Sequence, residues 1–568
     1  MGQDGSRQLT PLLRRAGRVT LIALPLLFLG LFFYYPLAGL VQSGLSSNTG
    51  FTLERLTRIF SDSYLRHVLL FTVEEALLST LASVALGLPL AYLLTAYDFP
   101  GKRWIKSLTI VPFALPAITV ALGFILVFGN NGALNRGLMA LFHLSSPPLA
   151  ILYSLQGIVL AHAFYNAPIV TRFVAAAWER LSPRYEESAR ALGAPRWRVF
   201  LNITLPMLMP ALASGAALAF IYSFLSFPIV LALGGARFST IEVEIYRRAI
   251  IQINYSGAAA LATLELLIAL LFTLGYLRLA ARYARHLQLA TPRPTRSLLT
   301  GPAGPRRWLI YAFIAASALL FVAPIAAVLL DSFSRTWQDQ TVFTLDWYLA
   351  IFRPTYSSLI AASPLQSIWN SLSFAGASMV IALTLGTGLA LNLTRRRFVG
   401  RSLLELLVMA PLGISSVALG LALLRTFVRP PLALSGHWIA IVIAHSILAI
   451  PFVIRAVRPA LERLAPRLSE AAHALGASPA RTTWEIVLPL IRPGLLTGAV
   501  FAFAISIAEM SATIMLTRPG LLTMPVAVYR FLATRQFGAA SAMSVLLIAV
   551  IALAFVLIER SGERALRG

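Results

Sequence analysis

The sequence predicts an all-α polytopic membrane protein in which about twelve transmembrane helices form two parallel six-helix repeats. Its composition differs from that of a soluble domain, since 58% of the 568 residues are hydrophobic and only 12% are charged, with a mean hydropathy of +0.78. A polar stretch also recurs after 283 residues, close to half the chain length, so that Glu187 corresponds to Glu470 and Gly193 to Gly476. Self-similarity at this period indicates one unit copied twice.

Each predicted span is an apolar stretch long enough to cross a bilayer as a helix, which takes about 20 residues. The twelve stretches lie near residues 19–41, 68–95, 107–129, 149–176, 208–233, 257–280, 308–330, 366–393, 403–426, 438–457, 493–516 and 539–559. Six of them fall in each half of the chain, so both copies enter the membrane with the same orientation.

Basic residues decide that orientation, because Lys and Arg concentrate in cytoplasmic loops. They gather at the N-terminus, in alternate loops and at the C-terminus, within residues 7–18, 102–106, 180–198, 282–307, 395–401, 463–481 and 560–567. A few outer arginines, such as Arg247 and Arg248, run against this trend without outweighing it. Both termini are therefore expected in the cytoplasm.

The region between the two copies is rich in Pro, Gly and Arg, as linkers are. We therefore divide the chain into a first half (1–281), a cytoplasmic linker (282–307) and a second half (308–568). The first half holds roughly sixteen extra residues, which we expect in an outer loop near 130–148.

The repeated polar stretch reads ERLSPRYEESARALGAPRW from Glu179 and ERLAPRLSEAAHALGASPA from Glu462. Pro183 and Pro466 suit the start of a helix, and the following glycines suit its end. A short polar helix outside the membrane indicates a docking element for a partner. An ordinary connecting loop is the alternative, and the second copy at a matched position favours docking.

Several classes of function are disfavoured by the composition. The net charge of +25 is explained by loops that flank membrane helices, so no nucleic-acid partner is expected. The chain contains no cysteine, which excludes disulfides and thiol ligands. It also lacks the G-x4-G-K-[ST] phosphate loop, and FPGKRW at Phe99 holds only a lone Gly-Lys pair. We therefore expect no catalytic site, no metal site and no cofactor bound by this chain.

The two polar stretches fit the pattern E-A-A-x3-G-x9-I-x-L-P, the EAA motif of permease subunits of bacterial binding-protein-dependent ABC importers, which the chain resembles. The matching residues are Glu187, Ser188, Ala189, Gly193, Ile203, Leu205 and Pro206, and then Glu470, Ala471, Ala472, Gly476, Ile486, Leu488 and Pro489. Only Ser188 departs from the pattern.

The resemblance implies a type I ABC importer permease fold in the bacterial inner membrane. It also implies that 186–198 and 469–481, within the loops 179–206 and 462–489, are coupling helices. Two copies of a cytoplasmic ABC ATPase would dock there and use ATP, and a separate solute-binding protein would deliver the solute from outside.

Fusion of both halves in one chain is similar to the thiamine and ferric-iron importer permeases. The first half resembles the thiamine permeases in DSYLRHVLLF, LQGIVLAHAFYNAPIVTRF and LALGGARFSTIEVEIYRRA, from Asp62, Leu155 and Leu231. The second half, with EMSATIMLTRPGLLTMPVAVY from Glu509, is equally compatible with iron permeases. The resemblance implies thiamine or ferric iron as the solute.

The fifth helix of each half directly follows a docking element, so we expect both helices to line the pore. Ser223 and Ser226 correspond to Ser506 and Glu509 in the repeat. An ionisable group inside the membrane is a functional candidate, and Glu509 would offer a carboxylate to a cationic solute. The alternative is a structural carboxylate at the outer interface or paired with a neighbour such as Arg518.

Other polar residues in the apolar stretches have structural interpretations. We expect Glu74 and Glu75 in the outer headgroup region, because helix ends tolerate charge. His162 and His445 are expected to pack as polar groups between helices, with a gating role left open. The prolines Pro112, Pro116 and Pro411 mark either broken helices or ordinary kinks.

Two other classes of function remain as alternatives. A secondary transporter also has two six-helix halves, and TRRRFVGRS from Thr394 is a weak match to the basic loop of such carriers. A docking loop has no purpose in a carrier without an ATPase. A membrane enzyme ranks last, because the sequence shows no cluster of His, Asp and Glu suited to catalysis.

Overall fold

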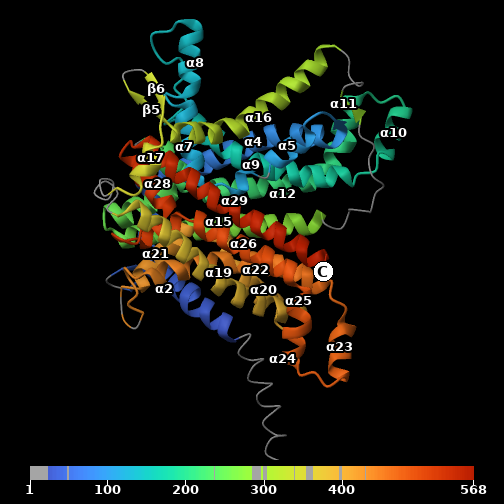
Figure 1. The fold of residues 1–568 in the computed structure, drawn as a ribbon, viewed down its shortest axis with the longest axis vertical. Helices are drawn as coiled ribbons and strands as arrows, with labels where there is room; N and C mark the ends of the chain where they lie inside the picture. Colours follow the sequence, from blue (N-terminus) through green and yellow to red (C-terminus); the bar gives the residue numbers. More distant parts are fainter. Residues whose placement is uncertain are drawn as a thin grey trace, which may run out of the picture. The chain divides into compact units, whose positions relative to one another are not determined.

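The structure is a computed structural model, and it describes residues 23–47, 50–109, 111–235, 237–283, 296–298, 304–337, 340–353, 362–395, 399–428, 430 and 432–567. Helices dominate this part of the chain (Figure 1). The N-terminal arginines and most of the predicted linker lie outside the described residues.

The elements of the first half include three π-helical turns, labelled η. In chain order they are η1 (Gly30–Tyr34), α2 (Tyr35–Gly44), β1 (Ser46–Ser47), β2 (Gly50–Phe51), α3 (Glu54–Ser61), α4 (Ser63–Ala96), β3 (Tyr97–Asp98), α5 (Lys102–Leu108), α6 (Val111–Ala114), α7 (Ala117–Phe128), α8 (Ala133–Phe142), α9 (Leu155–Glu179), α10 (Arg184–Ala191), α11 (Arg196–Val199), η2 (Phe200–Thr204), α12 (Leu205–Phe224), α13 (Pro228–Leu233), α14 (Ile241–Tyr246), η3 (Arg247–Ile251) and α15 (Tyr255–Tyr283).

The elements of the second half follow β4 (Arg296–Ser297). Its elements are α16 (Pro305–Ser332), β5 (Ser334–Trp337), β6 (Gln340–Phe343), α17 (Asp346–Ala350), α19 (Pro364–Arg395), α20 (Arg401–Met409), the 3₁₀ turn η5 (Ala410–Gly413), α21 (Ser416–Thr426), α22 (Trp438–Glu462), α23 (Pro466–Ala474), α24 (Pro479–Thr482), η6 (Thr483–Val487), α25 (Leu488–Leu490), α26 (Arg492–Ala508), α27 (Ser511–Leu516), α28 (Met524–Ala533) and α29 (Phe537–Arg567).

The predicted number of spans is confirmed within the described residues. Ten helices are long and apolar enough to cross a membrane, and the number rises to twelve if each of two bent helix pairs is one span. The bent pairs are 401–413 with 416–426, at 99°, and 479–490 with 492–508, at 75°. The extra residues predicted near 130–148 contain the helix α8.

The described chain divides into two compact units. The α4 unit comprises Leu53–Trp347 and Arg535–Ala542, and the α19 unit comprises Met1–Thr52, Tyr348–Thr534 and Met543–Gly568. In the α4 unit, α4 packs against α9 and α12. In the α19 unit, α19 packs in the same way against α22 and α26. We call these three helices of each unit its scaffold helices, and the two units share one arrangement of them.

The first helix of each half packs with helices of the other half. Helix α2 contacts α21 within the α19 unit, whereas α16 contacts α7 within the α4 unit. The pair α7 and α21 are repeat counterparts, so each receives the first helix of the opposite half. The boundaries predicted at 281 and 308 therefore describe the repeat, while packing groups the helices differently.

The scaffold helices approach closely at two matched glycines. A Cβ at Gly87 on α4 would lie 2.8 Å from the Ala167 carbonyl oxygen and 2.9 Å from Val170 Cβ. A Cβ at Gly386 on α19 would lie 2.9 Å from Val453 Cβ, and Val453 is the repeat counterpart of Val170. Both contacts are tighter than ordinary packing, so the helices can meet there only because the side chain is absent.

The third helix of each half is broken, as one interpretation of its prolines predicted. Pro116 lies at the N-cap of α7, and the free carbonyl of Leu115 accepts a hydrogen bond from Tyr165 Oη at 2.9 Å. In the second half Pro411 lies in η5, and Ser415 Oγ caps α21 by accepting from Ala418 N at 3.1 Å. Each break is stabilised locally, since a helix end inside a membrane must satisfy its backbone groups.

One described part of the predicted linker is attached to the α4 unit. Residues Arg296–Ser297 pair in parallel with Tyr97–Asp98, and Leu298 N donates to Asp98 O at 2.8 Å. The Leu298 side chain is fully buried. The linker is therefore held beside the end of α4 at this point.

Candidate functional site

The first docking element has the helix start and end that the sequence predicted. Pro183 occupies the N-cap of α10, and Gly193 follows the helix with φ at +84°. The left-handed conformation lets Ala194 N donate to Ala189 O at 3.1 Å, which closes the helix end. The chain then turns into α11, so 186–198 is a helix, a turn and a second short helix.

The second docking element repeats this geometry. Helix α23 begins at Pro466, and Gly476 follows it with φ again at +84°. Ala477 N donates to Ala472 O at 2.9 Å, as in the first copy. The elements α11 and α24 begin and end at corresponding residues, as do η2 and η6. The repeat therefore extends from sequence to backbone conformation.

The Leu-Pro pair that ends each motif explains the π-helical turn before it. Pro206 and Pro489 have no N–H, so each leaves one carbonyl of the preceding turn without its usual partner. The leucine before each proline bonds one residue further back than in an α-helix: Leu205 N donates to Phe200 O, and Leu488 N donates to Thr483 O. The π-helical turn thus joins each docking element to the fifth helix of its half.

The docking elements present apolar and charged side chains on their surfaces. Leu192 and Leu475, at matched positions before the glycines, are each 89% exposed. Glu187 and Glu470 are also exposed, whereas Ala472 is buried. Exposed leucines outside a membrane segment are typical of a surface that a partner covers.

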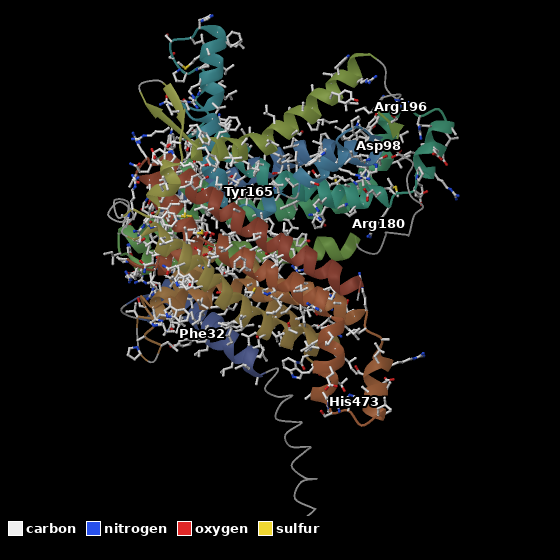
Figure 2. The ribbon with its side chains drawn as sticks, in the orientation of Figure 1. Phe32, Asp98, Tyr165, Arg180, Arg196 and His473 are labelled. Atoms are coloured by element: carbon white, nitrogen blue, oxygen red, sulfur yellow. The ribbon has the colours of Figure 1, made fainter. Side chains whose placement is uncertain are left out.

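The docking elements lie away from the scaffold helices of their own units (Figure 1). Figure 2 shows Arg180 and Arg196 at the end of the α4 unit where α10 lies, with Tyr165 within the helices. Thr204 Oγ1 donates to Glu186 Oε1 at 2.9 Å, which attaches α10 to η2. A force applied to α10 would therefore pass through η2 into α12.

Inside the α4 unit, a histidine and a carboxylate form a buried cluster. His162 Nδ1 contacts Glu75 Oε1, and its Nε2 lies 2.7 Å from Ser226 Oγ. Ser79 Oγ donates to the same Glu75 oxygen at 2.6 Å. Beside this cluster, Asn166 Nδ2 donates to Ser223 Oγ at 2.9 Å. The cluster joins α4, α9 and the segment between α12 and α13.

The α19 unit holds a second buried histidine–carboxylate cluster. His445 lies 2.7 Å from both Ser506 Oγ and Thr513 Oγ1, and its Nε2 lies 3.5 Å from Glu509 Oε2. Glu509 follows the end of α26, and its oxygens accept from Ala512 N at 2.9 Å and from Thr513 N at 3.0 Å. The carboxylate therefore caps α27 as well as facing the histidine.

All four predicted pathway residues lie buried in these clusters. Ser223 and Ser226 are near His162, and Ser506 and Glu509 are near His445. The partner of Glu509 is His445, so the alternative pairing with Arg518 is not the one observed. A role of these side chains in solute passage stays a prediction.

The structure shows different surroundings for Glu74 and Glu75, while their depth in the membrane stays a prediction. Glu74 is exposed, but Glu75 is fully buried against His162, a contact that was not predicted. The sequence does carry a signal for this position, because Thr72, Glu75, Ser79 and Ser83 recur at three- and four-residue spacing on one helix face. The histidines do pack as polar groups between helices, as expected.

Glu405 is paired near the end of α22, where Arg458 contacts both Glu405 and Glu462. Among the residues that the structure describes, no three His, Asp or Glu side chains gather in a way that could hold a metal ion.

Comparison with known proteins identifies similar sequences. The sequence model of the family described as "Binding-protein-dependent transport system inner membrane component" matches residues 83–286 and 379–567. The chain is 30% identical over 508 residues to a thiamine transport system permease protein of Brucella suis, covering 88% of each chain.

Two further relatives are named for other solutes. A ferric transport system permease protein of Actinobacillus pleuropneumoniae is 26% identical over 527 residues, which cover 92% of this chain and 75% of the relative. A putative 2-aminoethylphosphonate transport system permease protein of Salmonella paratyphi A is 32% identical over 262 residues, which cover 46% of this chain and 90% of the relative.

Proposed function

The chain belongs to the family of binding-protein-dependent transport system inner membrane components, and from this premise we propose that it imports thiamine or ferric iron across the bacterial inner membrane. It is the multi-pass permease of a binding-protein-dependent ABC importer. The observation that carries the proposal is the pair of matched docking elements. In each, a left-handed glycine follows the first helix, and a π-helical turn joins the element to a fifth helix.

The partners follow from this architecture. Two copies of a cytoplasmic ABC ATPase dock on the chain, one on 186–198 and one on 469–481, so both docking elements and both termini face the cytoplasm. A solute-binding protein delivers the solute to the opposite face. The ATPase subunits use the ATP, and this chain binds no cofactor of its own.

Transport proceeds by alternating access between two discrete states. Closure of the ATPase subunits on ATP displaces α10 and α23. Each displacement passes through η2 or η6 into the fifth helix, α12 or α26, and opens the pathway outward. The residues Glu187, Ser188, Ala189, Gly193 and Pro206, with Glu470, Ala471, Ala472, Gly476 and Pro489, shape the coupling elements. Hydrolysis then resets the pathway inward.

Two relatives support two different solutes. The thiamine permease has the higher identity and the more complete mutual coverage, so thiamine is the first candidate. Ferric iron is the second. Both are cationic, and the pathway residues proposed for contact are Ser223, Ser226, Ser506 and Glu509.

Uptake by purified components tests this proposal. The chain is placed in lipid vesicles with its ATPase subunits, and the binding protein is supplied outside with labelled thiamine or with ferric iron. We expect uptake only when ATP is accessible to the ATPase subunits. Uptake without ATP under an ion gradient would overturn the proposal in favour of the alternative, a secondary transporter. If neither thiamine nor ferric iron is taken up in the presence of ATP, only the assignment of the solute is overturned.

A further inference from the structure

Two buried carboxylates, those of Glu75 and Glu509, reach repeat-related histidines from different helices. His162 and His445 are counterparts, 283 residues apart, and each faces the break at the end of a fifth helix. Glu75 reaches His162 from the scaffold helix α4. Glu509 reaches His445 from the helix break itself.

The counterpart of each carboxylate is a residue that cannot replace it. In the scaffold helices the repeat offset is 299 residues, as the matched Gly87 and Gly386 show, so Glu75 corresponds to Phe374. At the helix break the offset is 283 residues, so Glu509 corresponds to Ser226. Each half therefore contains one carboxylate that contacts its histidine. Glu75 contacts Nδ1 of His162, whereas Glu509 contacts Nε2 of His445.

Hydrogen bonds nearby support both offsets. Thr72 Oγ1 accepts from Ile241 N at 3.0 Å in the α4 unit. Ser371 Oγ accepts from Met524 N at 2.7 Å in the α19 unit. Thr72 and Ser371 are separated by 299 residues, and Ile241 and Met524 by 283. These two offsets are the ones used above to find the counterparts of the two carboxylates. The hydrogen bond at Thr72 and the one at Ser371 are therefore equivalent contacts in the two halves, and they support both offsets independently.

The backbone at the two breaks is also alike. Ser226 N donates to Ser223 O at 3.2 Å, and Glu509 N donates to Ser506 O at 3.3 Å. Phe227, with φ −100° and ψ −58°, matches Met510, with φ −119° and ψ −35°. The short helices α13 and α27 then begin and end at corresponding residues. A carboxylate at position 226 could therefore adopt the position that Glu509 has in the other half.

We propose that Glu75 and Glu509 are equivalent positioning residues, each of which holds the histidine of the fourth helix, His162 on α9 or His445 on α22, against the break at the end of the fifth helix. We further propose that this carboxylate can be supplied from either side. A buried carboxylate and imidazole each need the other, since a polar group without a partner is costly in the interior. The fifth helix carries the displacement of the docking element. In the first half Glu75–His162 determines whether this displacement continues into α13, and in the second half Glu509–His445 determines whether it continues into α27. This step rests on the proposed function.

Transplanting the second arrangement into the first half tests the proposal. The single variants Glu75→Phe and Ser226→Glu remove the carboxylate or add a second one. The double variant E75F/S226E places Phe and Glu where the second half has Phe374 and Glu509, while Val230 stays at the position that corresponds to Thr513. The complete importer with each variant is assayed in vesicles for solute transported per ATP hydrolysed, with Glu74→Phe as the exposed neighbouring control.

We expect each single variant to lower this ratio by about tenfold or more, because a buried pair is broken or a like charge is added. We expect the double variant to transport to within about threefold of the unmodified chain, since neighbouring substitutions couple. The control should behave as the unmodified chain does. A double variant no better than the worse single variant overturns the proposal, and so do single variants with unchanged coupling.

A folding defect does not leave the proposal undecided. If Glu75→Phe fails to accumulate in the membrane, the comparison becomes the amount and the thermal unfolding midpoint of each variant, and recovery in the double variant is still required. Glu75→Gln, which keeps the volume of the side chain, provides the second single variant and should show the same loss of coupling. These unfolding measurements do not depend on solute transport. If the unmodified chain takes up no solute, that result therefore counts against the proposed function and not against the role of the two pairs.

Discussion

The docking elements and the buried histidine clusters have changed to different degrees between the two copies of the repeat. Outside the membrane, Gly193 and Gly476 have the same φ, and the π-helical turns begin and end at corresponding residues. Inside, the carboxylate moves from α4 in one copy to the break after α26 in the other. A surface that must fit a partner constrains backbone shape, whereas an internal pair constrains only which groups meet.

The largest effect is expected where the preserved geometry is broken. Gly193→Pro should abolish coupled uptake, because proline fixes φ near −65° and cannot adopt the +84° that ends α10. Gly476→Pro should have the same effect if the copies are equivalent. ATP hydrolysis and solute uptake are measured in vesicles, and the amount of chain in the membrane should remain unchanged. Normal uptake in both variants would contradict the coupling assignment.

Reversing charge on the second docking element should have the next largest effect. Glu470→Arg places a cation on an exposed position of α23 without altering its helix, so only contacts with a partner should change. We expect hydrolysis to become independent of solute while uptake falls about tenfold. Arg467→Glu serves as the matched variant on the same short helix. Equal coupling in Glu470→Arg and the unmodified chain would exclude this residue from docking.

A third substitution sharpens the comparison of the two buried carboxylates. Glu509 accepts from two backbone N–H groups and from Thr513 Oγ1, whereas Glu75 Oε2 has no hydrogen-bond partner among the described residues. Glu509→Ala should therefore lower the free energy of unfolding by about 1–3 kcal/mol more than Glu75→Ala, since it also removes the cap of α27. Thermal unfolding in detergent decides, and a more stable Glu509→Ala variant would contradict this order.

Close packing of the scaffold helices predicts a smaller effect. Gly87→Ala places a Cβ 2.8 Å from a backbone oxygen, which cannot move as a side chain can. We expect a loss of about 1–3 kcal/mol in the free energy of unfolding. Gly386→Ala meets Val453 and should lose somewhat less. Gly376→Ala on the same helix has nothing within 4 Å and is the control. Alanine favours a helix more than glycine does, so a loss there equal to that of Gly386→Ala would contradict the packing explanation.

The smallest effect concerns the broken third helix. Tyr165→Phe removes the donor to Leu115 O and should cost about 0.5–1.5 kcal/mol. The second half has Leu448 at that position and uses Ser415 as a cap, so Ser415→Ala is the corresponding change there and should cost a similar amount. Unfolding midpoints of both variants give the comparison, and an unaffected Tyr165→Phe variant would contradict the role assigned to this bond.

Local features of this molecule could be predicted from sequence because their causes are local. The starts of α10 and α23 at proline and their ends at glycine depend on a few adjacent residues, and the structure confirms them. The twelve apolar stretches are likewise a property of consecutive residues.

Features that depend on distant partners could not be predicted in the same way. The contact of Glu75 with His162 was not predicted, because its partner lies 87 residues later, on another helix. The exchange of α2 and α16 between the units was also missed, since the order of helices along the chain does not say which helices they pack against. The different positions of the carboxylate in the two copies also depend on distant partners, because each carboxylate is identified by the histidine that it contacts.

The central claim is that the two docking elements connect this permease to an ATPase, and its most direct test is a comparison of what purifies with the chain. The unmodified chain and the Gly193→Pro/Gly476→Pro variant are isolated gently from membranes, and their partners are identified by mass spectrometry. We predict that a subunit with an ATPase phosphate loop accompanies the unmodified chain and is lost from the variant. A chain that purifies alone and moves solute in vesicles without ATP would contradict the account.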